Sequence, residues 1–461
     1  MKEVEKFGVF IYSGAMNWQI FQQDEDGFGE IELKGRWRLD EAECAVEMRL
    51  VNQDTGAVVS KDTDWKQAVT KTDGTWSGEI KRVPAGGLYR IETRLTHKKQ
   101  PLKEWSIRGD IIHNIGVGDL WVIAGQSNAV GYGREAVNDS PELGVHLMRN
   151  SEKWILATHP LNDSTDTRHP VNCDIPNPGH SFCLSFAKIL KRNLGYPIGF
   201  IQTALGGSPL TRWNPLEEGD LYKNMLHCIE LAGGKIKGIL WYQGCSDTDD
   251  KGSASYGSRF KNTLLRWRKD LKDDGISILT VQLNRVYGIK DKAVDRGWSK
   301  VREAQRQAAL ELKNIFITPA IDLPLSDTVH ISSAGNMILG ERMARVALGG
   351  VYKKPIQFKA PDIAKASGCN GGKTVRLIFD NVVGRLCNQD SDSPCFKVED
   401  EKGAVDITQI EYKGSEVYLK LLRKLEGSAV VHGAYGANPP MVPVDIDRMI
   451  PMLAFYNVKV G

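Results

Sequence analysis

The sequence of 461 residues predicts an α/β fold: a three-layer α/β/α domain on a parallel sheet, flanked by β-rich, sandwich-like modules. Three observations predict it. Short β-like runs separated by turn signals come first, apolar strands then alternate with helix-like segments, and β-like runs return beyond Lys354-Pro355. Because a chain of this length exceeds one ordinary core, we expect three domains, over residues 1–115, 116–354 and 355–461.

The first module is expected from short runs rich in β-branched and aromatic residues. Residues 7–12, 47–51 and 88–94 are such runs, and turn signals such as Asp73-Gly74 and the Pro-Ala-Gly-Gly of 84–87 separate them. This pattern is typical of a small antiparallel sandwich.

The central domain is expected from strands that alternate with helical patterns, which indicates parallel strands joined by crossover helices. The expected strands are 120–124, 198–202, 236–242, 276–282 and 315–318. The expected helices lie near 180–193, 221–232, 256–272, 299–312 and 333–348. Five strands in this order make a compact three-layer domain.

The last part of the chain again shows alternating apolar and polar residues without helical patterns. The expected strands are 374–379, 407–412, 416–421 and 429–431. The pattern fits either a separate β module or an extension of the first module that packs against it.

Composition excludes several classes of partner. A formal net charge of +3 is close to neutral for this length, so nucleic-acid binding is not expected. The eight cysteines form no CxxC pair and no metal-ligand spacing, although Cys387 and Cys395 could pair across a loop in an oxidising compartment. No apolar run approaches the roughly 20 residues of a spanning helix, and the N-terminus lacks a signal core. We expect no membrane partner, and a cytoplasmic protein or a secreted or periplasmic one whose leader has been removed.

The strongest local signal for chemistry is Ser127. An apolar strand ends in Gly-Gln-Ser-Asn at 125–128, and a turn and a helix follow. Open α/β domains bind ligands at this carboxyl edge of the sheet, and the new helix directs backbone N–H groups at a developing anion. An ordinary helix N-cap serine is the structural alternative.

A serine nucleophile needs a base, and His330 is the candidate. Asp327 precedes it by three residues, in the loop after the last expected strand of the central domain. Such a short loop can hold carboxylate and imidazole side by side. A solvent-exposed loop pair is the alternative. Of the other histidines, His180 at the start of a helix is expected to be structural or to line the pocket.

Two further strand ends supply hydrogen-bond donors for an oxyanion. Gly206 and Gly207 follow the strand at 198–202, and Gln243 follows the strand at 236–242. An N–H from Ser127, one from the glycine pair and the Gln243 amide would make a three-donor oxyanion hole. Four features at carboxyl ends of strands in one sheet indicate an active site more strongly than any of them alone.

These segments resemble, in order and context, the sequence blocks of the SGNH (GDSL-like) hydrolases, and within them the sialate O-acetylesterase and acetylxylan-esterase-like family. The resemblance rests on 125–128, 206–213, 241–244 and 327–330 and covers roughly 115–350. The N-terminal β-rich segment is also similar to that family's first module.

The resemblance implies a triad of Ser127, His330 and Asp327, with oxyanion donors from Ser127, Gly207 and Gln243. It implies hydrolysis of acetyl esters on a carbohydrate through an acetyl-enzyme, chemistry that needs no metal and no organic cofactor. One position departs from the pattern, because Cys245 stands where relatives often have glutamate.

Residues near the same strand ends are expected to contact the sugar: Gln126, Asn128, Arg212, Trp213 and Trp241, with Tyr132 and Arg134 nearby. The two tryptophans fit the core equally well, and the arginines slightly favour an acidic sugar. Three alternatives stay open: an esterase for acetylated xylan, an esterase for other acyl esters, and a carbohydrate-binding protein without activity. Oligomeric state cannot be predicted.

Overall fold

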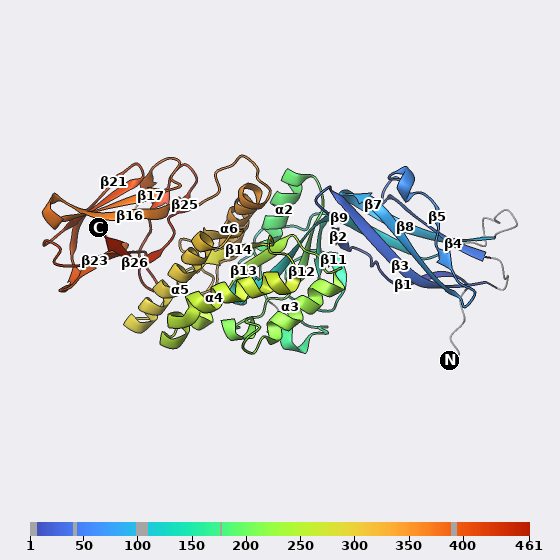
Figure 1. Cartoon of the computed structure of the whole chain (residues 1–461), viewed down its shortest axis with the longest axis horizontal. Helices are drawn as coiled ribbons and strands as arrows, with labels where there is room; N and C mark the ends of the chain where they lie inside the picture. The colour runs from blue at the N-terminus through green and yellow to red at the C-terminus, as the bar shows by residue number, and fades with distance from the viewer. Residues whose placement is uncertain (1–6, 40–43, 98–108, 176–177, 389–393) are drawn as a thin grey trace.

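A computed structural model describes residues 7–39, 44–97, 109–175, 178–388 and 394–461. Its elements lie in three regions along the longest axis of the molecule: β-strands at the N-terminal end, an α/β region in the middle, and β-strands at the C-terminal end (Figure 1). The two β-rich regions therefore lie at opposite ends, which fits a separate last module and not the alternative in which that module packs against the first.

The N-terminal region contains two layers of antiparallel strands. One layer has the order β1 (Gly8–Ser13), β3 (Phe28–Arg38), β7 (Thr75–Pro84) and β6 (Val69–Thr70). In the other layer β4 (Cys44–Asn52) pairs with both β5 (Lys66–Gln67) and β8 (Gly86–His97). Buried residues of both layers, among them Trp76 and Val46, share one apolar core, because strands such as β3 bury every second residue.

Strand β9 (Ile111–Gly125) connects this region to the middle of the molecule. Its first residues pair with β8 and with β2 (Ile20–Gln22), whereas its last residues pair with strands of the central sheet. The expected domain boundary at 115–116 falls inside this strand, so one continuous backbone ladder joins the two regions (Figure 1).

The central sheet is parallel except at one edge. Its strands in spatial order are β11 (Trp154–Leu156), β10 (Val145–Met148), β12 (Ile198–Gln202), β9, β13 (Gly238–Tyr242), β14 (Ser277–Gln282) and β15 (Ile315–Pro319). Only β10 and β11 pair antiparallel. All five expected strands are present, and the expected α/β class is confirmed; β10 and β11 are additional strands.

Helices lie on both sides of this sheet, α2 and α6 above it and α3 and α4 below it in Figure 1. The helices are α1 (Ser127–Val130), α2 (Cys183–Leu194), α3 (Asp220–Leu231), α4 (Asp250–Leu271), α5 (Lys292–Glu311) and α6 (Ser333–Val346). Helix α4 starts before the expected 256 because the Asp249 carboxylate accepts hydrogen bonds from the Lys251 and Gly252 N–H groups, an N-cap.

The C-terminal region is an eight-stranded sheet with a small three-stranded sheet beside it. The larger sheet has the order β20 (Gly403–Val405), β19 (Phe396–Asp400), β23 (Ala429–Gly433), β26 (Phe455–Val460), β16 (Asp362–Cys369), β17 (Thr374–Asp380), β22 (Glu416–Leu421) and β21 (Ile407–Lys413). The smaller sheet contains β18 (Leu386–Cys387), β24 (Val444–Asp445) and β25 (Ile450–Pro451). Gln282 of β14 exchanges two hydrogen bonds with the Ala454 backbone, which ties this region to the central one.

None of the eight cysteines, all of which lie in the described ranges, forms a disulfide, so Cys387 and Cys395 are not paired. Within the described ranges, no helix is both long enough and apolar enough to cross a membrane.

Candidate active site

Ser127 lies at the carboxyl edge of the central sheet, directly after the middle strand β9. It is the first residue of α1 and is 8% exposed. Gly125 makes the preceding turn possible, because its φ is 120° and a Cβ there would lie 2.3 Å from the Tyr242 carbonyl oxygen. The sharp strand-to-helix turn thus sets the hydroxyl at the rim of the sheet.

Asp327 and His330 form the carboxylate–imidazole pair that their spacing predicts. The Asp327 Oδ2 atom lies 2.7 Å from His330 Nδ1, and Oδ1 accepts hydrogen bonds of 2.8 Å from the Val329 and His330 N–H groups. Burial alone would raise the pKa of Asp327, but these hydrogen bonds lower it below its ordinary value. The carboxylate therefore stays ionised and fixes Nδ1, which leaves Nε2 for chemistry.

The buried side chain of Asn128 joins the turn of Ser127 to the loop of His330. Its amide donates to the Val329 carbonyl at 3.3 Å and its oxygen accepts from the Ile331 N–H at 2.9 Å, one residue on each side of His330. Among the described residues no hydrogen bond connects the Ser127 hydroxyl with the imidazole; such bonds in catalytic sites often tighten only when substrate binds. Asn128 is 2% exposed, and its side chain binds the backbone on both sides of His330; its expected role as a substrate contact stays a prediction.

Two backbone N–H groups at this rim are available for an oxyanion. Within the described part of the chain, neither the Ser127 nor the Gly207 N–H has a hydrogen-bond acceptor. The Leu205 N–H donates to the Gly125 carbonyl at 3.0 Å, which holds the glycine turn beside Ser127. By contrast, the Gly206 N–H is occupied by the Asp174 carboxylate at 2.8 Å.

The side-chain amide of Gln243, the expected third oxyanion donor, is hydrogen-bonded to other protein groups. Its side chain is fully buried, and its amide nitrogen donates to Asp247 Oδ2 at 2.6 Å and to the Ser208 carbonyl at 3.3 Å. Its oxygen accepts from the Tyr256 hydroxyl at 2.9 Å. Both amide hydrogens are thus used inside the protein in this structure, and the role of Gln243 as an oxyanion donor stays a prediction.

The side chain of Gln126, an expected substrate contact, binds protein groups at the same rim. This residue is 3% exposed, its side-chain oxygen accepts from the Gly244 N–H at 2.9 Å, and its nitrogen donates to Ser246 Oγ at 3.3 Å. The Ser246 hydroxyl in turn donates to the Gly207 carbonyl at 3.2 Å. Gln126 therefore connects the ends of three strands.

Three further residues that we expected to contact the sugar make contacts with other protein groups. Trp213 and Trp241 are fully buried and pack edge to face with their ring centroids 5.3 Å apart, so they belong to the core. The Arg212 guanidinium binds the Asp220 carboxylate at 2.7 Å and the Val171 carbonyl at 3.1 Å. Sequence order placed these residues near the strand ends, but the two indoles are enclosed in the core and the half-buried Arg212 guanidinium is held by a carboxylate.

The sequence analysis missed two carboxylates that organise the rim. Asp174 accepts hydrogen bonds from the Tyr132 hydroxyl at 2.6 Å and from the Gly206 N–H. Glu135 accepts from the Ser326 hydroxyl at 2.7 Å and from the Ser333 N–H at 2.9 Å. Neither residue stands at a strand end, so no sequence signal marks it.

Cys245 is not a competing nucleophile. Burial raises the pKa of its thiol to about 12, so the reactive thiolate is suppressed. His180 is likewise structural, because it lies 3.0 Å from the buried Asp139 carboxylate, which also binds His159.

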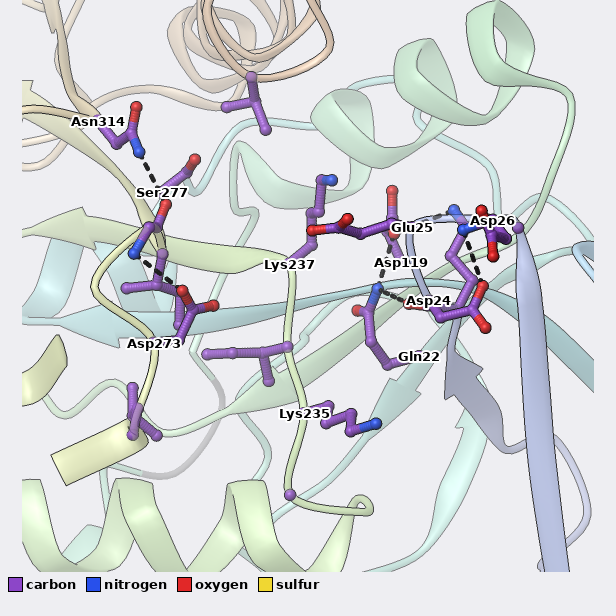
Figure 2. A pocket seen from close by; sticks show the side chains of 18 of the residues that line it. Gln22, Asp24, Glu25, Asp26, Asp119, Lys235, Lys237, Asp273, Ser277 and Asn314 are labelled. Carbon is purple, nitrogen blue, oxygen red and sulfur yellow. Dashed lines mark hydrogen bonds between the residues drawn. The ribbon is translucent and has the colours of Figure 1, made fainter. Parts of the chain in front are cut away.

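A hollow of about 1000 Å³ lies at the other edge of the sheet, where β13 and β14 begin. Figure 2 shows polar side chains lining it, among them Asp119, Lys237 and Ser277. Asp119 accepts a hydrogen bond of 2.9 Å from the Gln22 amide. This hollow is separate from the rim that carries Ser127.

Comparison with known proteins identifies the family of the central region. The family model described as "Carbohydrate esterase, sialic acid-specific acetylesterase" matches residues 117–349, half of the chain. A probable carbohydrate esterase of Arabidopsis thaliana is 30% identical over 253 residues, covering 50% of this chain and 90% of the relative. Human sialate O-acetylesterase is 24% identical over 232 residues, covering 42% of each protein.

The crystal structure of a carbohydrate acetylesterase from Xanthomonas citri has the same fold over nearly the whole chain. Its TM-score is 0.68 at 20% identity, with 95% of this chain and 97% of that chain covered. The match includes the flanking β-rich regions. By its family match, the chain belongs to the sialic acid-specific acetylesterase family of carbohydrate esterases, enzymes that hydrolyse carboxylic esters.

Proposed function

We propose that the protein removes O-acetyl groups from an acidic sugar of the sialate type, with Ser127 as nucleophile, His330 as base and Asp327 as the group that orients the base. One observation carries this proposal: Asp327 holds His330 Nδ1 at 2.7 Å while Asn128 binds the backbone on both sides of that histidine. The loop that carries His330 is thereby fixed to the turn that carries Ser127.

The chemistry follows from these contacts. Because Nδ1 donates to Asp327, His330 Nε2 is the nitrogen that takes the Ser127 proton as the hydroxyl attacks the acetyl carbonyl. The protonated imidazole then gives that proton to the departing sugar oxygen, which leaves an acetyl-enzyme. A water molecule that gives its proton to His330 then attacks the acetyl-enzyme in the same way, which releases acetate and restores the serine.

The oxyanion of the tetrahedral intermediate would receive the N–H groups of Ser127 and Gly207, which have no other acceptor in the described residues. Each donor of this kind is worth about 3 kcal/mol in the transition state. The Gly207 backbone has a φ of 66°, and a Cβ there would have open space around it, so the turn faces room for a ligand.

Recognition of an acidic sugar would depend on Arg134. Its side chain is exposed, and its backbone N–H donates to the Ser326 hydroxyl at 3.1 Å, one residue before Asp327. The Arg212 guanidinium binds the Asp220 carboxylate at 2.7 Å, and we do not assign this role to it. The family description and the human relative, which is named sialate O-acetylesterase, support the same substrate class.

Kinetics on three substrates test the proposal. We expect Ser127→Ala to lower kcat on p-nitrophenyl acetate by roughly 10⁴-fold or more, whereas the exposed Ser258→Ala should behave as wild type. Arg134→Gln should lower kcat/KM on O-acetylated sialic acid about tenfold and leave acetylated xylo-oligosaccharides unchanged. A preference of the wild type for the neutral xylan fragments would contradict the acidic-sugar assignment and favour the xylan alternative.

A further inference from the structure

Two imidazoles and a carboxylate converge away from Ser127, although they come from three separate segments. Glu152 lies in the turn between β10 and β11, His169 precedes the short helical turn at 170–172, and His227 lies on α3. One ligand atom from each side chain lies within 4.8 Å of the other two. The sequence spacing gives no hint of this group, because only the fold brings the three segments together.

The distances inside the group suit a metal ion better than a hydrogen bond. His169 Nε2 lies 3.6 Å from Glu152 Oε1, too far for a hydrogen bond. Two ligand atoms at about 2.0–2.1 Å from a tetrahedral zinc ion stand about 3.3 Å apart, so the His169–Glu152 pair needs to close by only a few tenths of an ångström. The His227 ligand atom lies within 4.8 Å of both and would move in with its exposed side chain. The other carboxylate oxygen, Oε2, faces Arg168 at 3.3 Å, which leaves Oε1 for the ion.

We propose that Glu152, His169 and His227 bind a divalent transition-metal ion, with Zn²⁺ as the ion that fits the donor set best. Two imidazole nitrogens and one carboxylate oxygen are ligands that Zn²⁺ takes in proteins, and water supplies the fourth position. His169 is buried, whereas His227 is exposed on α3, so the ion has a path from solvent.

A second group of similar composition is already satisfied by protein groups. Asp139 Oδ2 lies 3.1 Å from His159 and 3.0 Å from His180, and its Oδ1 binds the Lys188 ammonium at 2.5 Å. A metal ion there would have to displace a buried ammonium group. Glu152 carries no comparable buried cation among the described residues, since Arg168 is largely exposed.

The proposed ion would tie the segment from 152 to 174 to helix α3. That segment ends at Asp174, which accepts the Gly206 N–H at 2.8 Å next to the glycine turn. Arg212 Nη2 also donates to the Val171 carbonyl of this segment at 3.1 Å. Metal binding should therefore stabilise the structure that supports the rim, whatever ester the rim hydrolyses.

Zinc titration of the full chain after dialysis against EDTA tests the site. We expect one Zn²⁺ per chain, a rise in Tm on adding Zn²⁺, and tetrahedral visible absorption with Co²⁺. Because loss of an outer-shell partner alone weakens metal binding by roughly 10- to 100-fold, His227→Ala should weaken it by at least about 100-fold. Glu152→Gln should weaken it similarly, and the exposed histidine variant His113→Ala should bind as wild type.

Two outcomes would overturn the proposal. The first is no saturable Zn²⁺ binding by the wild type, and the second is equal affinity of wild type and His227→Ala. Since His227 is exposed, its variant should keep the wild-type circular dichroism spectrum, and His227→Gln serves as a second variant if it does not. These readouts concern binding, so failure of the esterase assignment would not affect them.

Discussion

Asn128→Ala should slow catalysis without contacting substrate, because it releases the His330 loop from the Ser127 turn. The change leaves the buried Ile331 N–H without its acceptor, a loss of about 1–3 kcal/mol. The Val329 carbonyl loses less, about 1 kcal/mol, since the Asn284 amide still donates to it at 2.6 Å. If the misaligned imidazole raises the activation free energy by about 3 kcal/mol, kcat falls roughly 10²-fold.

Steady-state kinetics on p-nitrophenyl acetate, combined with thermal unfolding, measure this effect. We expect kcat to fall while KM stays within about twofold, because the side chain positions the base and does not bind the ester. Gln282→Ala is the matched control: this buried amide also bonds to the backbone, with two hydrogen bonds to Ala454 and one to the Arg302 carbonyl, all far along the chain from His330. It should lower Tm to a similar extent and leave kcat unchanged.

The reasoning is refuted if Asn128→Ala lowers Tm like the control and keeps kcat within twofold of wild type. A rise in KM at constant kcat would instead restore the substrate-contact role that the sequence predicts.

Three other changes have expected outcomes of their own. Asp327→Asn should lower kcat roughly 10⁴-fold with little change in Tm, measured by the same assay, because the imidazole loses the group that orients it. Burial lowers the pKa of His146 to about 4 from an ordinary 6.5, so as pH falls below 6.5 the unfolded chain takes up a proton that the native state excludes. Between pH 7 and pH 5 this should cost about 2 kcal/mol of unfolding free energy, so urea titrations should find a fall that is about 2 kcal/mol smaller in His146→Gln than in the wild type. Gln243→Ala should lower stability by about 2–4 kcal/mol because it strips partners from Asp247 and Tyr256; a 10²-fold loss of kcat at unchanged Tm would instead support the oxyanion role.

The sequence predicts well what depends on local patterns. Each apolar run of the central region is a strand, because a parallel sheet buried on both faces needs continuous apolar segments. Asp327 and His330 pair as expected, since three residues of spacing place both in one short loop. The strand-to-helix turn at Ser127 likewise follows from a glycine-containing segment at a strand end.

Other features depend on tertiary packing, which local patterns do not encode. The segments of Trp213 and Trp241 lie near the active edge, yet the direction of each indole is set by the neighbouring core. Gln243 follows its strand as expected, but the buried carboxylate of Asp247 and the Tyr256 hydroxyl hold its amide inside. Asp174 comes from an irregular loop, so only the fold shows that it meets the glycine turn.

The role of Ser127 as nucleophile is tested most directly by covalent labelling with a fluorophosphonate, followed by mass spectrometry of the peptides. Only an activated hydroxyl reacts, so the adduct should lie on Ser127 in the wild type, be absent in Ser127→Ala and form much more slowly in His330→Ala. An unlabelled, folded wild-type protein, or an adduct on another residue, would contradict the assignment.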